Sequence, residues 1–195
     1  MRLSPAGSQK LEAFEETFKL VEGVMGFVPN SMKAMAHNPA ILKGFLGLSM
    51  AVLGPDNSLD PGLRQMIAYV TSSAAGCRYC QAHTSHTGHR QGVSAEKIEA
   101  LWEYETSELF TEAERAALSV AQAGGSVPNE ATDAQFETLK QHFSAVEIAE
   151  IVAVVSLFGF LNRWNDTLAT PLEDSPIAFA EAHLASRGWE IGDHG

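Results

Sequence analysis

Both cysteines of the chain lie in one short segment, AAGCRYCQAHTSHTGHRQG, together with three of its seven histidines. Cys77 and Cys80 are three residues apart, and on a helix this spacing places two side chains on adjacent positions of one face. Two such thiols can form a disulfide with each other, bind a metal ion, or carry a haem. The positions of the neighbouring histidines distinguish these three kinds of site.

Haem attachment and metal binding are both disfavoured by the spacing. Covalent haem attachment requires a histidine directly after the second cysteine, and Gln81 occupies that position. Zinc has possible ligands in Cys77, Cys80, His83 and His86, but positions spaced by three drift by about 60° around a helix at each step. Four such side chains spread over half the circumference and cannot easily reach one ion. We therefore predict a dithiol site with no metal and no cofactor.

The thiol pair follows Gly76, which we interpret as a helix break, so we expect the pair in the first turn of a new helix. Unpaired backbone N–H groups and the helix dipole favour a thiolate there, and the thiolate is the nucleophile toward a peroxide or a disulfide. Helix position alone favours Cys77 as the more activated thiol. His83 is the histidine nearest to the thiols and is our candidate general base.

These residues also have purely structural interpretations. Cys77 and Cys80 can be small buried apolar side chains, and the ring of His83 can be satisfied by a backbone carbonyl. His86 and His89 point progressively away from the thiols, and we interpret them as polar residues of the surface or of an interface.

The segment must be positioned by helices, because helix-start signals recur throughout and no alternating strands joined by Asn-Gly or Asp-Gly turns occur. The run IVAVVSLF taken alone would also suit a buried strand, but the capping box from Ser144 to Glu147 and the length of the run favour a helix. We predict an all-α fold. The expected helices begin near Asn30, Pro39, Pro61, Ser94, Thr111, Asp133, Ser144 and Ser175.

An internal similarity relates two parts of the chain at an offset of 85 residues. The segment LRQMIAYVTSSAAGCRYCQ, from Leu63, matches IAEIVAVVSLFGFLNRWND, from Ile148, mainly in its apolar pattern. Gln65 falls opposite Glu150, and Cys80 falls opposite Asn165. We interpret this as two similar helical halves, of which only one has thiols; chance similarity between apolar helices is the alternative.

Length and composition indicate one domain over residues 1–195, with 1–15 and 188–195 as loose ends. The formal net charge is -11, with 24 acidic against 13 basic residues, which argues against a nucleic-acid partner. We also expect no membrane association, because no uncharged run reaches the roughly 18 apolar residues of a membrane span. An acidic run precedes any apolar core of a signal peptide, so we expect a cytoplasmic protein.

Four motifs together resemble a known family: GFVPN, LRQMIAYVTSSAAGCRYCQAHT, FTEAERAALSVA and FGFLNRWNDTL. They resemble the alkyl hydroperoxidase D-like branch of the carboxymuconolactone decarboxylase superfamily, and within it the peroxidase-related proteins. The resemblance implies an all-helical fold with a compact antiparallel helical core, a homo-oligomer (dimer, trimer or hexamer) and reduction of organic peroxides. It also implies that the second cysteine, Cys80, attacks the peroxide and that Cys77 resolves the sulfenic acid to a disulfide. This assignment differs from the one that helix position alone favours.

The sequence departs from the family's proton relay at two positions. The family has a glutamate twelve residues before the first cysteine and a histidine four after the second, where this chain has Gln65 and Thr84. Gln65 can form hydrogen bonds but cannot take a proton at neutral pH. A shifted relay would use His83 with a carboxylate from elsewhere. Our candidate is Glu150, opposite Gln65 in the internal match, although a solvated acid on a helix face is the alternative reading.

The polar run from Asn162 to Asn165 has side chains that would suit a pocket wall, or a cap and a subunit contact.

We therefore expect a thiol-dependent peroxidase that reduces alkyl hydroperoxides or hydrogen peroxide through a Cys77/Cys80 cycle, slowed by the altered relay. A separate dithiol partner, which the sequence does not identify, would restore the thiols. The alternative is a non-catalytic redox sensor or assembly protein in which a reversible disulfide changes the contacts of an oligomer. The thiol pair argues against decarboxylation, because the decarboxylases of the superfamily do not use it.

Overall fold

Caps within the sequence determine where most of the helices begin. The side chain of Asn38 accepts the Ala40 N–H, and the side chain of Asp60 accepts the Leu63 N–H, each just before a first-turn proline. Reciprocal capping boxes begin three later helices, including the two expected at Thr111 and Ser144. The prediction of an all-α fold is confirmed.

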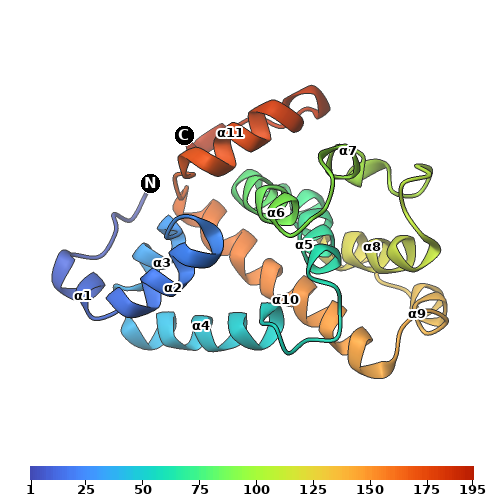
Figure 1. Ribbon diagram of the computed structural model, residues 1–195, viewed down its shortest axis with the longest axis horizontal. Coiled ribbons are helices and arrows are strands. Elements are labelled where there is room, and N and C mark those ends of the chain that lie inside the picture. Colours follow the sequence, from blue (N-terminus) through green and yellow to red (C-terminus); the bar gives the residue numbers. More distant parts are fainter.

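The computed structural model describes residues 1–195 and contains helices without strands (Figure 1). The α-helices are α1 (Ser8–Glu12), α2 (Glu15–Met25), α3 (Asn30–Met35), α4 (Pro39–Leu53), α5 (Pro61–Ala75), α6 (Arg78–Arg90), α7 (Ala95–Glu99), α8 (Glu112–Gly125), α9 (Asp133–Leu139), α10 (Ala145–Leu168) and α11 (Asp174–His183). Short 3-10 helices are η1 (Leu101–Glu103), η2 (Ala185–Arg187) and η3 (Gly192–His194).

Helix α5 occupies the centre of the fold, and every residue from Gly62 to Ser72 is buried. It packs against α6, α8 and α10, while α11 covers α6 and α4 lies along α10 (Figure 1). The run that also suited a strand forms the middle of α10. By length and composition α10 would also suit a membrane crossing, and 33% of its apolar window is buried. Ile151, Val154 and Leu157, on one face of the helix, are fully buried in the common core.

Gly76 separates α5 from α6, as the sequence predicts. Its φ of +80° is left-handed, a conformation that ends helices and that glycine adopts without a steric penalty. The Cys77 N–H then donates to the Ser72 carbonyl at 3.0 Å, and Cys77 becomes the N-cap of α6. In the second half of the internal match, Leu161 stands where Gly76 stands in the first. No break occurs there, so α10 continues as one helix.

The two ends of the chain are packed, which corrects the expectation that residues 1–15 and 188–195 are loose. The Arg2 guanidinium donates to the carbonyls of Asp166 and Thr167, which lack partners within α10 because they lie in its last turn. The indole of Trp189 is buried and donates to the Arg78 carbonyl at 3.2 Å. Both ends therefore lie close together over the C-terminus of α10 (Figure 1).

A pair of glycine substitutions tests the importance of the break at Gly76. Gly76→Ala should lower the free energy of unfolding by about 1–2 kcal/mol, because an L-residue is disfavoured at this positive φ although its Cβ would meet no atom. Gly23→Ala, in the exposed part of α2 and equally free of contacts, should instead raise it by about 0.5–1 kcal/mol. Urea unfolding of both variants measures the two changes. Equal effects would show that the left-handed conformation carries no cost.

Candidate active site

The two thiols lie at the start of α6, where the sequence predicts them. Cys77 is the N-cap, and its sulfur accepts the backbone N–H of Cys80 at 3.5 Å. Both cysteines are free and buried. The two thiols also lie close enough to hydrogen-bond to each other.

A cavity of about 430 Å³ lies against only one of these thiols. Cys80 forms part of its wall, whereas Cys77 lies outside the lining and is fully buried behind it. The wall is mainly apolar, and its apolar side chains include Leu20, Met32, Phe45, Leu46, Phe158 and Leu161. The cavity is therefore suited to an organic molecule, with Cys80 as the thiol that such a molecule would meet.

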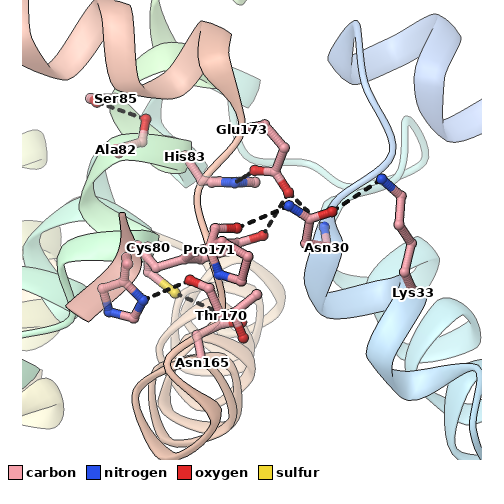
Figure 2. A network of polar contacts seen from close by, with 12 residues as sticks. Asn30, Lys33, Cys80, Ala82, His83, Ser85, Asn165, Thr170, Pro171 and Glu173 are labelled. Atoms are coloured by element: carbon pink, nitrogen blue, oxygen red, sulfur yellow. Dashed lines mark hydrogen bonds and ion pairs between the residues drawn. The ribbon is translucent and has the colours of Figure 1, made fainter. Parts of the chain in front are cut away.

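Asn165 of α10 contacts the Cys80 sulfur. Its Nδ2 donates to Sγ at 3.6 Å, so the two positions that the internal match equates lie together in space (Figure 2). The other amide atom, Oδ1, is buried without a protein partner, and Asn165 also lines the cavity. A polar group of a bound molecule can therefore donate to this oxygen. The neighbouring Arg163 instead bonds to the carbonyl of Gly159 on its own helix.

His83 also lines the cavity and is paired with a carboxylate, Glu173. The ring Nε2 lies 2.6 Å from Glu173 Oε2, and both side chains are only 10% exposed. The other oxygen, Oε1, accepts the Asn30 N–H (Figure 2). It also accepts the Tyr79 hydroxyl at 3.1 Å. The Tyr79 ring stacks on the His83 ring at 4.3 Å between centroids. These contacts hold the imidazole in one orientation beside Cys80.

Two pKa shifts describe the charges around the thiols. Burial alone would raise the pKa of Glu173, but the hydrogen bond and charge of His83 together with the Asn30 N–H lower it overall. Glu173 is therefore a carboxylate at neutral pH. The pKa of Cys77 is raised, first by its hydrogen bond to Cys80, then by burial, and further by Asp166. Cys77 is consequently a thiol, although it caps a helix.

The two altered relay positions both lie in the cavity wall. Gln65 is buried there, on α5. The hydroxyl of Thr84 donates to the Cys80 carbonyl at 2.7 Å, within its own helix. Neither side chain carries a proton between groups at neutral pH. His83 is the histidine of the wall that is paired with a carboxylate, and its partner Glu173 is not part of the lining.

Glu150 does not supply the relay carboxylate that we expected from it. Its carboxylate accepts the backbone N–H groups of Ser58 and Leu59 at 3.0 to 3.1 Å and so holds the loop before α5. Glu173 is the residue that sequence reasoning missed. It lies 90 positions from His83, after the end of α10, and no local motif connects the two. His89 is exposed and His86 half-buried, away from the thiols' hydrogen bonds.

Comparisons with known proteins agree with this geometry. Residues 39–123, from α4 through most of α8, match the Carboxymuconolactone decarboxylase family. The uncharacterised protein YnjA of Escherichia coli (strain K12) is 29% identical over 115 residues, which span 59% of this chain and 63% of YnjA.

Two solved structures are similar over most of the chain. A crystal structure of a cysteine-to-alanine variant of the debrominase Bmp8, in complex with 2,3,4-tribromopyrrole, has a TM-score of 0.86 at 33% identity and covers 93% of this chain and 97% of its own. A peroxidase-related protein from Silicibacter sp. TM1040 has a TM-score of 0.78 at 25% identity, covering 89% and 91%. The chain therefore belongs to the carboxymuconolactone decarboxylase superfamily, in its alkyl hydroperoxidase D-like branch.

Proposed function

We propose that this protein is a thiol-dependent reductase that transfers two electrons from Cys80 and Cys77 to an organic hydroperoxide. The single observation that carries the proposal is the placement of the two sulfurs. Cys80 lines an apolar cavity of about 430 Å³, and Cys77 lies behind it, in contact with the Cys80 backbone. One thiol therefore meets the substrate, and the other is reserved for closing the disulfide.

The cavity wall supports an organic substrate over hydrogen peroxide. Its surface is mostly apolar, and burying the alkyl part of a hydroperoxide contributes about 25 cal/mol for each Å² removed from water. Hydrogen peroxide has no such part. The unpartnered Oδ1 of Asn165 is available to accept a hydrogen bond from the hydroperoxide O–H, next to the attacking sulfur. Two different features of the wall thus bind the two ends of one substrate.

In the first step, the Cys80 thiolate attacks the terminal oxygen of the hydroperoxide. A sulfur–oxygen bond forms, the oxygen–oxygen bond breaks, and the electron pair leaves on the alkoxide, which takes a proton to become an alcohol. Cys80 is now a sulfenic acid. His83, which lines the same cavity and is held by Glu173, is the group placed to handle protons.

In the second step, Cys77 attacks the sulfur of the Cys80 sulfenic acid. A disulfide forms and water leaves, so the cycle converts one hydroperoxide and two thiols into an alcohol, water and a disulfide. An external dithiol then reduces the disulfide by thiol–disulfide exchange. The raised pKa of Cys77 keeps this thiol protonated until Cys80 has reacted, which separates the two steps in time.

Reductive dehalogenation is a second candidate, favoured by the whole-length similarity to the debrominase Bmp8. The same two thiols balance that reaction. Cys80 would take the bromine from carbon, the carbon would take a proton, and Cys77 would displace bromide from Cys80 as the disulfide forms. The aromatic rings of Tyr79, His83 and Phe27 beside the cavity suit a flat substrate.

Substitution of each cysteine tests the proposed cycle. With dithiothreitol as reductant, the wild-type protein should reduce cumene hydroperoxide over many turnovers and with a higher kcat/KM than hydrogen peroxide. Cys80→Ser should reduce the rate to the background without protein. Without added reductant, the wild-type protein and Cys77→Ser should each consume one equivalent of hydroperoxide, but only the wild-type protein should lose two thiols, because Cys77→Ser has no second thiol to close the disulfide. Hydroperoxide loss and free-thiol titration measure both outcomes.

Several results would contradict the proposal. Dithiol-dependent peroxide consumption that survives Cys80→Ser would exclude Cys80 as the nucleophile. One stoichiometric oxidation of the wild-type protein, accompanied by a change in its size, would indicate a redox sensor in place of an enzyme. Bromide release from tribromopyrrole without turnover of cumene hydroperoxide would select the second candidate.

Two glutamates form a matched pair for the proton relay. Glu173→Gln keeps an oxygen that accepts from Tyr79 and Asn30 but removes the charge beside His83, so turnover should slow by about 10²-fold. Glu150→Gln removes a charge that bonds only to the loop before α5 and should leave turnover unchanged. Steady-state rates, with circular dichroism to confirm folding, measure the difference. The reverse order of effects would assign the relay to Glu150.

Stability should also depend on pH through Glu173. Its folded-state pKa lies below that of a glutamate in the unfolded chain, so its contribution is fully present above the unfolded value of about 4.3. That contribution is lost as the pH falls through the lower folded value. The difference in unfolding free energy between wild type and Glu173→Gln should therefore shrink as the pH falls below about 4.3. Urea unfolding over this range measures it, and a constant difference would contradict the ion pair.

A further inference from the structure

A second polar cluster lies beside Cys77, outside the cavity. The Cys77 sulfur, a carboxylate oxygen of Asp166 and a ring nitrogen of His194 all lie within 4.8 Å of one another. Asp166 and His194 do not line the cavity, and nor does Cys77. The three residues come from the start of α6, the last turn of α10 and η3. The tertiary structure thus gives the inner thiol a histidine and a carboxylate of its own.

The His194 ring has a defined orientation and tautomer. Its Nδ1 lies 2.8 Å from the carbonyl of Thr170, and a carbonyl can only accept, so Nδ1 carries the hydrogen. In the neutral ring Nε2 then has a lone pair and cannot donate to the carboxylate oxygen Oδ1 of Asp166, 3.3 Å away; Nε2 forms that hydrogen bond only when it takes up a proton. The His194 carbonyl also accepts the Leu172 N–H at 2.8 Å. A buried imidazole, 5% exposed, is therefore held with its basic nitrogen toward the cluster.

The three groups differ in their access to water. Cys77 is fully buried, and the His194 side chain is 6% exposed, whereas the Asp166 side chain is 42% exposed. A proton released by Cys77 has no direct exit to solvent. The carboxylate of Asp166 is the exposed end of the cluster, and it stabilises a positive charge on the adjacent imidazole. The cluster accordingly leads from the inner thiol to the surface.

Cys77 needs such a partner when the disulfide closes. The titratable groups facing it are Cys80, Asp166 and His194. The hydrogen bond to Cys80, burial and the charges of Cys80 and Asp166 raise the pKa of Cys77 and keep it a thiol. A thiol is a poor nucleophile, so attack on oxidised Cys80 requires that the proton leave as the new bond forms. His83 lines the cavity, which Cys77 does not reach.

We propose that His194 and Asp166 form a proton-transfer pair that serves Cys77 during disulfide closure. His194 Nε2 takes the proton as the sulfur–hydrogen bond of Cys77 breaks. The electron pair of that broken bond stays on the Cys77 sulfur and forms the new bond to the Cys80 sulfur. The leaving group departs from Cys80 with the electrons of the broken bond; from a sulfenic acid this is hydroxide, which takes a proton to become water. Asp166 positions His194 and stabilises the imidazolium. The inference rests on the proposed function in one respect, that Cys77 is the resolving thiol.

The chromogenic disulfide 2,2′-dithiodipyridine tests this step without the natural substrate. Attack by Cys80 releases one pyridine-2-thione and leaves a mixed disulfide, and attack by Cys77 on that disulfide releases the second. Stopped-flow absorbance should resolve two phases in the wild-type protein. In His194→Gln the first phase should be unchanged, and the second should be about 10²-fold slower near pH 7. This deficit should shrink as the pH rises, because hydroxide then deprotonates Cys77 directly.

Two further variants separate proton transfer from structural support. Asp166→Asn removes the charge but keeps the shape and should slow the second phase in the same direction. His183→Gln is the matched control, because His183 lies 2.8 Å from Glu99 in a histidine–carboxylate pair that belongs neither to the cluster nor to the cavity lining. It should change neither phase. Thermal unfolding of each variant shows whether its fold is retained.

Clear outcomes would overturn the inference. An unchanged second phase in His194→Gln, a pH-independent deficit, or an equal slowing of both phases would each show that His194 does not take the Cys77 proton. The probe requires only two thiols, so failure of cumene hydroperoxide turnover with two normal phases would reject the proposed substrate and leave the proton-transfer pair standing. A missing second phase in the wild-type protein would instead reject Cys77 as the resolving thiol.

Discussion

The rest of the site depends on the break in the backbone at Gly76. Its left-handed conformation ends α5, and one residue later Cys77 caps α6, so two thiols that are close in sequence are given different surroundings. Cys80, one turn into α6, lies in the cavity wall, and Cys77 lies in the core behind it. In an uninterrupted helix the two would lie on adjacent positions of one face. α10 has no glycine at the matching position, and it continues through that position as one unbroken helix.

Each sulfur is accompanied by its own histidine and carboxylate. His83, which lines the cavity with Cys80, is paired with Glu173, and His194 and Asp166 are on the inner side with Cys77. A dithiol cycle has two proton-transfer steps, one when the first thiol reacts with the substrate and one when the disulfide closes. Separate groups allow the first thiol to react while the second remains protonated. Helix position alone suggested the opposite order, because a helix dipole favours a thiolate at Cys77, but burial and neighbouring negative groups outweigh that dipole.

Both proton-handling pairs depend on the segment after α10. Glu173 lies just before α11, and His194 lies in η3, after α11 has crossed α6. Thr170 and Leu172, between α10 and Glu173, bind the ring and the carbonyl of His194, so one stretch of backbone positions both pairs (Figure 2). Packing of this tail, which composition alone suggested would be loose, is therefore a requirement for the site and not a covering added to it.

Local features of the sequence determined the helices, the break before the thiols and the pairing of Cys77 with Cys80, because caps, glycines and i,i+3 spacing act over a few residues. The tertiary structure alone decided which carboxylate serves His83. Glu150 was a reasonable candidate from the internal match, but its carboxylate holds the N–H groups of Ser58 and Leu59. Glu173 reaches His83 across 90 residues. Contacts over that distance arise from the packing of α6, α10 and α11 together, and no short pattern in the sequence encodes them.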